Sequence, residues 1–411
     1  MLPAPDAPPA TATGLVLTGG GARAAYQVGV LQALAKLRRG AGAASRGPLF
    51  PIITGTSAGA INAAALACGA DDFEATVRRI GQVWAGLGPD QIYSVDALRV
   101  LSSDAPWARL LSAGWLIARW RRSGSRSLLD NSPLRRLLEE LVPLGRLDEL
   151  MAQGHLDALA VTASSYGSGE HVTFYQASDT QQPWVRSRRL AAPVRIAREH
   201  LLASSAIPFV FPATALDIGG HAEYFGDGSM RQSAPLAAAI HLGARRILAV
   251  EAGRMLEPAE AQAPNVMSGY PSLAQIAGHA LSSIFLDALT ADVERLRRIN
   301  STLALIPAEA RAATTLEPVE LLLIAPSQRI DAIAARHVHA LPPAVRSLLG
   351  EPAVSAATAE LKGSALASYL LFDAGFTREL MALGRADTLN QRDAVCEFFG
   401  WGGLRRPGPV A

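Results

Sequence analysis

Gly14-Leu-Val-Leu-Thr-Gly-Gly-Gly21 is a short apolar run that ends in three glycines. Helical spacing of apolar residues follows it, from about residue 22 to residue 39. The same order returns where Pro51-Ile-Ile-Thr54 leads through Gly55 into the apolar run 58–68. A short apolar run that is closed by glycine and followed by helical periodicity indicates a buried parallel strand. The repeat therefore predicts an α/β fold, with a mostly parallel central sheet and loops at the carboxyl ends of its strands.

Outward from this core, further runs have the length and composition of strands: Ala158–Ala163, His171–Gln176, Ile247–Glu251 and Val319–Ile324. Helical stretches lie between them, the longest from about Ser272 to Asn300. We expect a flexible leader over residues 1–13, a catalytic domain over 14–326, and a mainly helical extension over 327–411 that packs on the core.

The amino-acid composition indicates a globular protein and argues against several classes of partner and site. Of the 411 residues, 49% are hydrophobic and 18% charged, so the chain can bury a large core. The formal net charge of +2 is too small to indicate a nucleic-acid partner. The two cysteines, Cys68 and Cys396, cannot form a disulfide framework or a four-ligand zinc site. Neither a secretory signal nor an uncharged apolar run of membrane-spanning length is found, so we expect a cytoplasmic protein, with homo-oligomerisation left open.

Gly55-Thr-Ser57-Ala-Gly59 matches the G-x-S-x-G pattern of a nucleophile elbow. Such a serine sits on a strained turn between a strand and a helix, where larger neighbouring side chains would collide. The chain holds this pattern once, after an apolar run, and no helix breaker follows before Gly69. The pattern predicts Ser57 as a nucleophile, and a plain helix-capping serine is the alternative.

Gly19-Gly-Gly21-Ala-Arg23 stands at the end of the first predicted strand. Successive glycines let backbone N–H groups converge on an anion, either a phosphate or the oxyanion of a tetrahedral intermediate. No Walker-type Gly-Lys-Ser/Thr follows, and Ala24 breaks the G-x-G-x-x-G pattern. With a nucleophile elbow on the neighbouring strand, an oxyanion hole is the better interpretation, and a plain tight turn is the alternative.

A serine hydroxyl needs a base before it can attack an ester. None of the eight histidines stands in a motif that marks it, whereas Gly226-Asp227-Gly228 places a carboxylate between two glycines. A partly desolvated carboxylate can take the proton directly. Asp227 is therefore the predicted base, with a simple Asp-Gly turn as the alternative.

The three motifs, in this order, resemble the patatin-like phospholipases, which carry a glycine-rich loop, then G-x-S-x-G, then D-G-G or D-G-A. The flanks Leu201–Pro208 and Ser233–Leu236 are similar too, and the resemblance covers about residues 14–326. Two positions differ. Ala24 replaces the usual glycine after the arginine, and Ser229 replaces the small residue after Asp-Gly.

The resemblance implies a Rossmann-like variant of the α/β-hydrolase fold, with helices on both faces of the sheet. It also implies a Ser57–Asp227 dyad that cleaves acyl esters of phospholipids, lysophospholipids or neutral lipids, without metal or organic cofactor. The implied oxyanion donors are the N–H groups of Gly19, Gly20, Gly21, Ala22 and Ala58. Arg23 is expected near the mouth of the site, where it would orient the loop or meet a phosphate headgroup. The supporting glycines are Gly55, Gly59, Gly226 and Gly228.

Two other functions stay open at this stage. A Ser–His α/β-hydrolase or acyltransferase would need a histidine after the serine, and His337 or His339 could supply it. A catalytically inactive lipid-binding protein could also keep the fold.

The segment Trp107–Arg136 stands apart from the rest of the sequence. It interleaves aromatic with basic residues: Trp107, Trp115 and Trp120 with Arg109, Arg119, Arg121, Arg122 and Arg126. Such residues on one helix suit the headgroup region of a membrane. We therefore expect a partly helical cap at about residues 105–136 and peripheral contact with a lipid surface. A surface helix with its tryptophans turned to the core is the alternative.

Overall fold

In the computed structural model of the protein, the residues described are 12–42, 47–94, 127–178, 183–253, 273–311, 313–349 and 364–402. The three tryptophans and five arginines of the expected cap lie outside the described residues, as does nearly all of the expected leader. The described end of the cap segment begins at residue 127 and runs into the helix that starts at Ser132.

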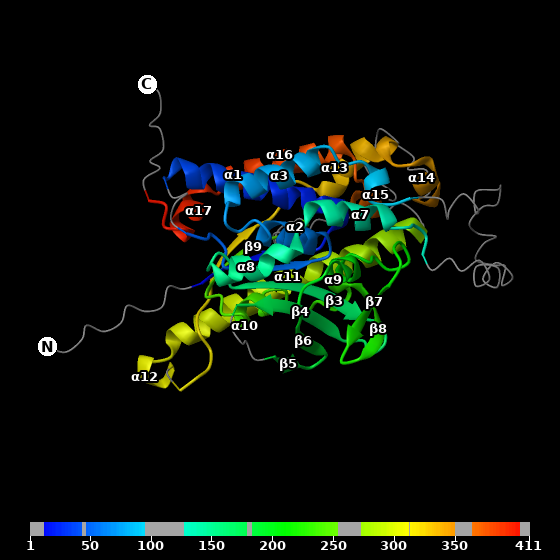
Figure 1. Cartoon of the computed structure of the whole chain (residues 1–411). Coiled ribbons are helices and arrows are strands. Elements are labelled where there is room, and N and C mark those ends of the chain that lie inside the picture. Colours follow the sequence, from blue (N-terminus) through cyan, green and yellow to red (C-terminus); the bar gives the residue numbers. More distant parts are fainter. Residues whose placement is uncertain are drawn as a thin grey trace, which may run out of the picture.

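A ten-stranded sheet forms the centre of the described chain (Figure 1). Its strands are β1 (Thr13–Leu17), β2 (Ile52–Thr56), β3 (Ala158–Ser165), β4 (His171–Ala177), β5 (Val185–Arg186), β6 (Arg189–Pro193), β7 (Thr214–Ile218), β8 (His221–Asp227), β9 (Arg246–Val250) and β10 (Glu320–Ile324). The order is β10-β9-β1-β2-β3-β4-β6-β5, and β8 pairs with β3 and β7. All neighbours from β10 to β3 are parallel, whereas β4 and β8 run antiparallel to β3. The predicted α/β class with a mostly parallel sheet is confirmed.

Helices cover both faces of this sheet (Figure 1). The longer ones are α1 (Ala25–Gly40), α2 (Ala58–Ala67), α3 (Phe73–Ala85), α7 (Ser132–Leu141), α11 (Leu273–Leu305), α13 (Ile330–His337) and α16 (Ala374–Asn390). The shorter ones are α8 (Leu147–Ala152), α9 (Arg198–Ser204), α10 (Ala237–His241), α12 (Ala308–Arg311), α14 (Pro343–Leu349), α15 (Ser364–Leu370) and α17 (Arg392–Phe398). Single 3-10 turns are η1 (Gly21–Ala24), η2 (Pro89–Gln91), η3 (Leu144–Arg146), η4 (Gly228–Arg231) and η5 (Val338–Ala340).

Two hydrophobic cores lie on opposite faces of the sheet. On β1, Leu15 and Leu17 pack into the larger core with α1, α2 and α16. Val16, between them, packs into the smaller core with α10 and α11. Because successive side chains of a strand point to opposite faces, a strand covered on both sides carries apolar residues at consecutive positions. This is why β1 contains the apolar run Leu15–Leu17 and β2 begins with Ile52 and Ile53.

The C-terminal helix α16 lies along α1, and glycines on both helices bring the two backbones close together. A Cβ on Gly29 would stand 2.1 Å from the Met381 carbonyl oxygen, and one on Gly384 would stand 2.2 Å from that of Tyr26. The Tyr26 hydroxyl also donates to Asp387 at 3.0 Å. The described part of the extension therefore packs on the core, while the domain boundary at residue 326 stays a prediction.

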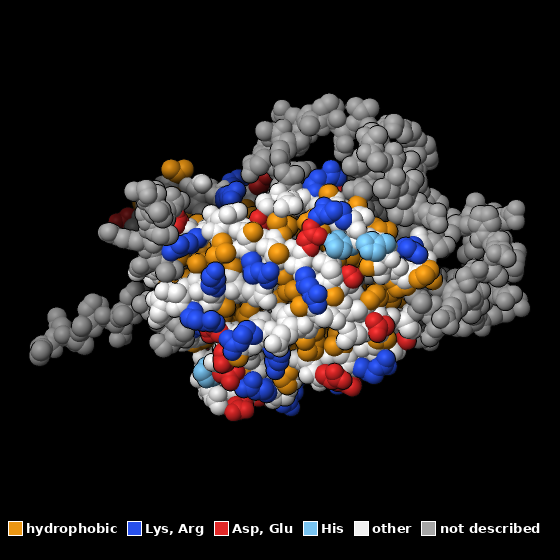
Figure 2. All heavy atoms as spheres, turned by 90° about the horizontal axis from the view of Figure 1, so that it is seen from above, with side chains coloured by type: hydrophobic (Ala, Val, Ile, Leu, Met, Phe, Trp, Pro, Cys, Tyr) orange, Lys and Arg blue, Asp and Glu red, His pale blue; other side chains and the backbone are white. Residues whose placement is uncertain are grey.

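The outer face over α1 and α16 carries arginine, acidic and apolar side chains side by side (Figure 2). Within the described surface of that view, basic side chains are more frequent than acidic ones (Figure 2). Among the helices that the structure describes, none combines the length and the apolar character that crossing a membrane requires.

Candidate active site

Strand register brings the two predicted catalytic residues together. Thr56, the last residue of β2, lies opposite Thr162 on β3. The next residue of β3, Ala163, lies opposite Asp227, the last residue of β8. Beside β3, β8 therefore takes the position that β2 leaves where its chain turns away at Ser57. As a result, Asp227 lies beside Ser57, although 170 positions separate the two residues in the chain.

Ser57 has the strained backbone of a nucleophile elbow. Its φ of +56° is in a region that residues with a side chain rarely adopt, and it is 1% exposed. Helix α2 begins at the next residue, Ala58. The flanking glycines make this turn sterically feasible, since a Cβ on Gly59 would lie 2.3 Å from the Thr18 carbonyl oxygen. A Cβ on Gly55 would lie 2.5 Å from the Gly59 carbonyl oxygen.

Asp227 is buried and bonded directly to the serine. The Ser57 hydroxyl donates to Asp227 Oδ2 at 2.5 Å, and the Ser229 N–H donates to Oδ1 at 2.9 Å. Burial raises the pKa of Asp227 to about 6, although both hydrogen bonds lower it. Ser229 contacts the carboxylate through its backbone N–H. A serine in place of the usual glycine or alanine therefore leaves this hydrogen bond intact. With this raised pKa, the Asp227 carboxylate is suited to accept a proton near neutral pH.

Close packing also explains the glycines beside Asp227. A Cβ on Gly228 would lie 2.3 Å from the Thr162 carbonyl oxygen, and one on Gly226 would lie 2.4 Å from the Tyr166 hydroxyl. Both glycines therefore let the end of β8 approach β3 closely enough to place the carboxylate.

The flank Leu201–Pro208 positions both residues. The Ser57 N–H donates to the Ser204 hydroxyl at 2.8 Å, and the Asp227 N–H donates to the Ala206 carbonyl at 2.9 Å. One short segment at the end of α9 thus holds the backbones of the serine and the carboxylate. The sequence singled out this flank by resemblance only, without a role for Ser204.

The glycine loop, residues 19–21, also lies at Ser57. Gly21, with φ +55°, lines a pocket together with Ser57 and Ala58. Gly20 directly precedes η1 and Gly21 begins it, and the N–H groups of both donate to no group in the described chain. Gly19, Gly20 and Ala22 do not line this pocket. The structure thus brings Gly21 and Ala58 to Ser57, and the role of the loop as an oxyanion hole stays a prediction.

The expectation that Arg23 lies at the mouth of the site is wrong. Arg23 is 4% exposed, its Nε donates to the Ser368 hydroxyl at 2.7 Å, and its guanidinium lies 4.3 Å from the Tyr369 ring centre. These contacts join the glycine loop to α15 of the C-terminal extension. Because tertiary packing buries the guanidinium, it is not placed to meet a lipid headgroup from solvent.

Ser57 lines a largely apolar pocket. Its walls come from α2, α3, α7 and the segment after α9, and they include Ile61, Val83, Trp84, Leu134, Leu137, Leu138, Leu141, Ile207, Phe211 and Phe372. The four leucines recur at three- and four-residue spacing, so they form one stripe of α7. Phe372 comes from the chain just after α15. An extended hydrocarbon would fit such surroundings.

A buried polar network behind the glycine loop was not foreseen. Gln27 Nε2 donates to the Thr18 carbonyl at 2.7 Å, and Asn62 Nδ2 donates to Gln27 Oε1 at 3.0 Å. The Trp84 indole N–H completes the chain by donating to Asn62 Oδ1 at 2.9 Å. The network ties α1, α2 and α3 to the loop after β1. Asn62 in the alanine-rich run of α2 was the available signal.

The histidines proposed for a Ser–His pair are engaged elsewhere. His337 Nε2 bonds Glu379 Oε2 at 2.8 Å, and its ring stacks near that of His339. In the described chain, the Ser57 hydroxyl has Asp227 as its hydrogen-bond partner and no histidine.

The sequence pattern of the family described as "Patatin-like phospholipase" matches residues 15–240, which is more than half of the chain. The chain belongs to this family. The name of the family describes enzymes that hydrolyse phospholipids. The match ends before β9 and β10, which complete the parallel part of the same sheet. None of the curated protein sequences compared with the chain matches it.

Solved structures give weaker likenesses. VipD from Legionella pneumophila has 13% identity and a TM-score of 0.29, over 91% of this chain and 67% of VipD. Human GIVD cytosolic phospholipase A2 has 10% identity and a TM-score of 0.43, over 95% of this chain. This chain spans 60% of the length of that human protein. ExoU from Pseudomonas aeruginosa, in complex with SpcU, has 16% identity and a TM-score of 0.25, over 97% of this chain and 82% of that one. The family assignment rests on the sequence match and not on these values.

Proposed function

We propose that this patatin-like protein hydrolyses acyl ester bonds of phospholipids, lysophospholipids or related lipids through an acyl-Ser57 intermediate. The observation that carries the proposal is the direct bond between the buried Asp227 carboxylate and the hydroxyl of Ser57, which lines an apolar pocket. An acyl chain would occupy the pocket, with its ester carbonyl at Ser57.

In the proposed reaction, Asp227 accepts the hydroxyl proton while Ser57 Oγ attacks the ester carbonyl carbon. Negative charge then develops on the carbonyl oxygen, where the N–H groups of Gly21 and Ala58 would donate to it. The alcohol leaves with the proton that Asp227 had taken, and the acyl chain stays on Ser57. Water, activated by the same carboxylate, releases the fatty acid and restores the serine.

Labelling with a fluorophosphonate probe, followed by mass spectrometry of the digested protein, tests the nucleophile. We expect one phosphonylated serine, at Ser57, and no labelling of Ser57→Ala. The hydrolysis of a mixed lipid extract by the two proteins then shows which ester class depends on this residue. An unlabelled wild-type protein, or equal hydrolysis by both proteins, would favour an inactive lipid-binding protein.

The pH profile tests the base. Asp227 must be unprotonated to accept a proton, and its pKa is raised to about 6, chiefly by burial. kcat/KM should therefore fall about tenfold per pH unit below that value and reach a plateau above it. Measuring kcat/KM on a soluble ester across this range checks the expectation.

Glu251 supplies the control for this profile. Burial raises its pKa to about 8, against hydrogen bonds from Thr18 and from the N–H groups of Ala252 and Gly253. If Glu251 were the catalytic base, the inflection of the pH profile would lie near pH 8. Glu251→Gln should keep the inflection near 6, and a profile without any acid limb would contradict the role of Asp227.

We also propose that Phe209 anchors the protein on the lipid surface from which the substrate comes. Phe209 is 81% exposed and adopts a φ of +66°, a strained conformation for an aromatic residue. Its neighbours Ile207 and Phe211 line the apolar pocket, while its own side chain points outward. An exposed aromatic ring beside the pocket suits insertion at the membrane boundary.

Phe209→Asn should lower binding to phospholipid vesicles by about tenfold, because burial of one aromatic side chain stabilises by about 1.5–3 kcal/mol. Asparagine tolerates a left-handed backbone, so the loop should persist. Leu305→Asn is the matched control, since Leu305 is 85% exposed at the far end of α11. Vesicle flotation measures binding, and cleavage of a soluble short-chain ester should stay unchanged. Equal vesicle binding by wild type and Phe209→Asn would place the membrane contact elsewhere.

A further inference from the structure

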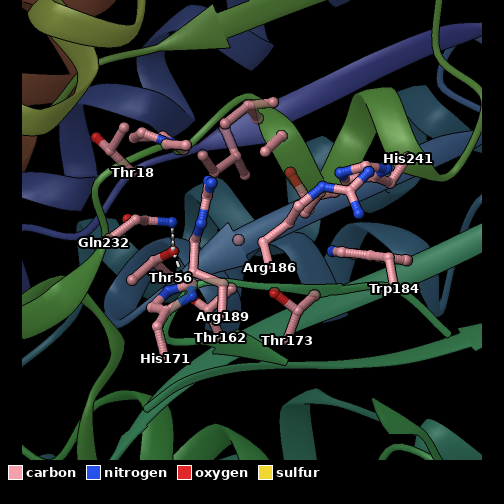
Figure 3. A pocket seen from close by; sticks show the side chains of 18 residues that line it. Thr18, Thr56, Thr162, His171, Thr173, Trp184, Arg186, Arg189, Gln232 and His241 are labelled. Atoms are coloured by element: carbon pink, nitrogen blue, oxygen red, sulfur yellow. Dashed lines mark hydrogen bonds between the residues drawn. The ribbon is translucent and has the colours of Figure 1, made fainter. Parts of the chain in front are cut away.

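Figure 3 shows a second pocket. It lies on the face of the sheet that carries the smaller core, opposite the apolar pocket. It shares no lining residue with the pocket at Ser57. Threonines of the sheet form its floor, among them Thr54, Thr56 and Thr173. The short strands β5 and β6, helix α10 and the chain after η4 form its sides. Threonine, arginine and histidine side chains line this pocket together with apolar ones, and it plays no part in the proposed hydrolysis.

Two arginines bring positive charge into this pocket. The side chains of Arg186 and Arg189 both reach into it from the β5–β6 hairpin (Figure 3). Within the described chain, neither guanidinium forms an ion pair, and Arg186 donates only to the carbonyl of Val185. One acidic neighbour, Asp292 on α11, already accepts from the Leu236 N–H and pairs with Arg295. The pocket therefore keeps an excess of positive charge.

His171 supplies a buried polar atom that lacks a partner. The side chain is 5% exposed and lines the pocket, and its Nε2 makes no hydrogen bond in the described chain. Burial and, to a lesser degree, the nearby charge of Arg189 together lower the pKa of His171 to about 4, so the ring is neutral. A neutral imidazole that carries its proton on Nε2 is a hydrogen-bond donor. Native proteins rarely leave such an atom unsatisfied, so an acceptor from a ligand is expected here.

We propose that this pocket binds the phosphate group of a small ligand. Arginine is the preferred partner of phosphate, because its planar fork donates to two oxygens at once. Arg186 and Arg189 would hold the phosphate oxygens, with His171 Nε2 as a further donor. The phosphate could belong to a free phosphate ester or to a lipid headgroup, since both present the same group. The inference does not rest on the proposed hydrolysis.

The floor of the pocket connects it to the catalytic strand. Gln232 Nε2 donates to the Thr56 hydroxyl at 2.8 Å, and this hydroxyl bonds that of Thr162 at 2.7 Å (Figure 3). Thr56 directly precedes Ser57. A ligand in the pocket would thus touch the strand that ends in the nucleophile, from the side that the substrate does not reach.

Binding measurements on the Ser57→Ala protein test this site without interference from hydrolysis. Isothermal titration calorimetry with inorganic phosphate and with glycerol 3-phosphate forms one arm. Flotation of vesicles with and without phosphatidic acid forms the other. In whichever arm binds, Arg189→Gln should weaken binding by about tenfold or more, because a charge-assisted bond to phosphate is lost. Arg186→Gln should act in the same direction.

Arg188→Gln is the matched control. Arg188 lies in the same hairpin, is exposed, and does not line the pocket, so its loss removes equal charge from the same surface. Binding of the soluble phosphates that Arg189→Gln weakens and Arg188→Gln spares would identify a free phosphate ester as the ligand. The same pattern only with phosphatidic acid vesicles would identify a lipid headgroup. No saturable binding in either arm, or equal weakening by Arg188→Gln, would overturn the proposal. Thermal unfolding confirms that each variant is folded.

Discussion

Ser57→Ala should lower the hydrolysis of phospholipid by at least about a thousandfold, and Asp227→Asn should have an effect of similar size. The alanine variant loses the atom that forms the acyl intermediate. The asparagine variant keeps the shape of the carboxyl group but cannot accept the proton of the serine hydroxyl. Initial rates of fatty acid release from phospholipid vesicles measure both losses.

The double variant should be little slower than either single variant, because residues that act as one unit have non-additive effects. Ser205→Ala is the matched control for the serine. The Ser205 hydroxyl also lines the apolar pocket, but it donates to the Leu201 carbonyl and takes no part in the proposed chemistry. That variant should keep most of the activity.

Two outcomes would contradict the dyad. Full activity of Asp227→Asn would require another base, and loss of activity in His337→Gln would identify that base as the histidine. We expect the His337 variant to stay active, because its ring nitrogen is bonded to Glu379.

The central strands could be predicted from local sequence, because local rules govern them. β1 and β2 are covered on both faces, so each contains consecutive apolar residues, Leu15–Leu17 and Ile52–Ile53, ahead of a glycine turn. The site residues Ser57 and Asp227 stood out because small flanking residues are required where backbones approach closely. Their mutual distance could not be predicted in the same way. It depends on the pairing of β8 with the end of β3, a long-range contact that no local pattern indicates.

The contacts of Arg23 show where local interpretation fails. An arginine beside a glycine-rich loop suggests an anion, and the sequence contains no sign that α15 covers it. Its partner, Ser368, lies 345 positions further along the chain. The same distance in sequence hid the contribution of Phe372 to the apolar pocket. Such contacts form only when the C-terminal extension packs on the catalytic core.

Gly21→Ala should reduce kcat on phospholipid by at least about a hundredfold, the usual cost of losing one oxyanion donor. The conformation of Gly21, with φ +55°, is unfavourable for alanine, and a Cβ there would lie 2.3 Å from the Tyr369 carbonyl oxygen. Because backbone surrounds this point, the loop must move, and the Gly21 N–H moves with it. Stopped assays at saturating substrate, normalised to folded protein, measure the change.

A substitution at Gly42, two residues after the end of α1, distinguishes the effect of backbone strain from the loss of the oxyanion donor. Gly42 has a φ of +64°, and a Cβ added there meets no atom within 4 Å. Gly42→Ala therefore carries the same backbone strain, about 1–2 kcal/mol of stability, far from the apolar pocket. It should unfold at a lower temperature and keep its kcat. KM should change little in Gly21→Ala, since an oxyanion donor acts mainly on the transition state. If Gly21→Ala, once folded, hydrolyses phospholipid as fast as Gly42→Ala does, then the glycine loop is a tight turn that does not hold the oxyanion.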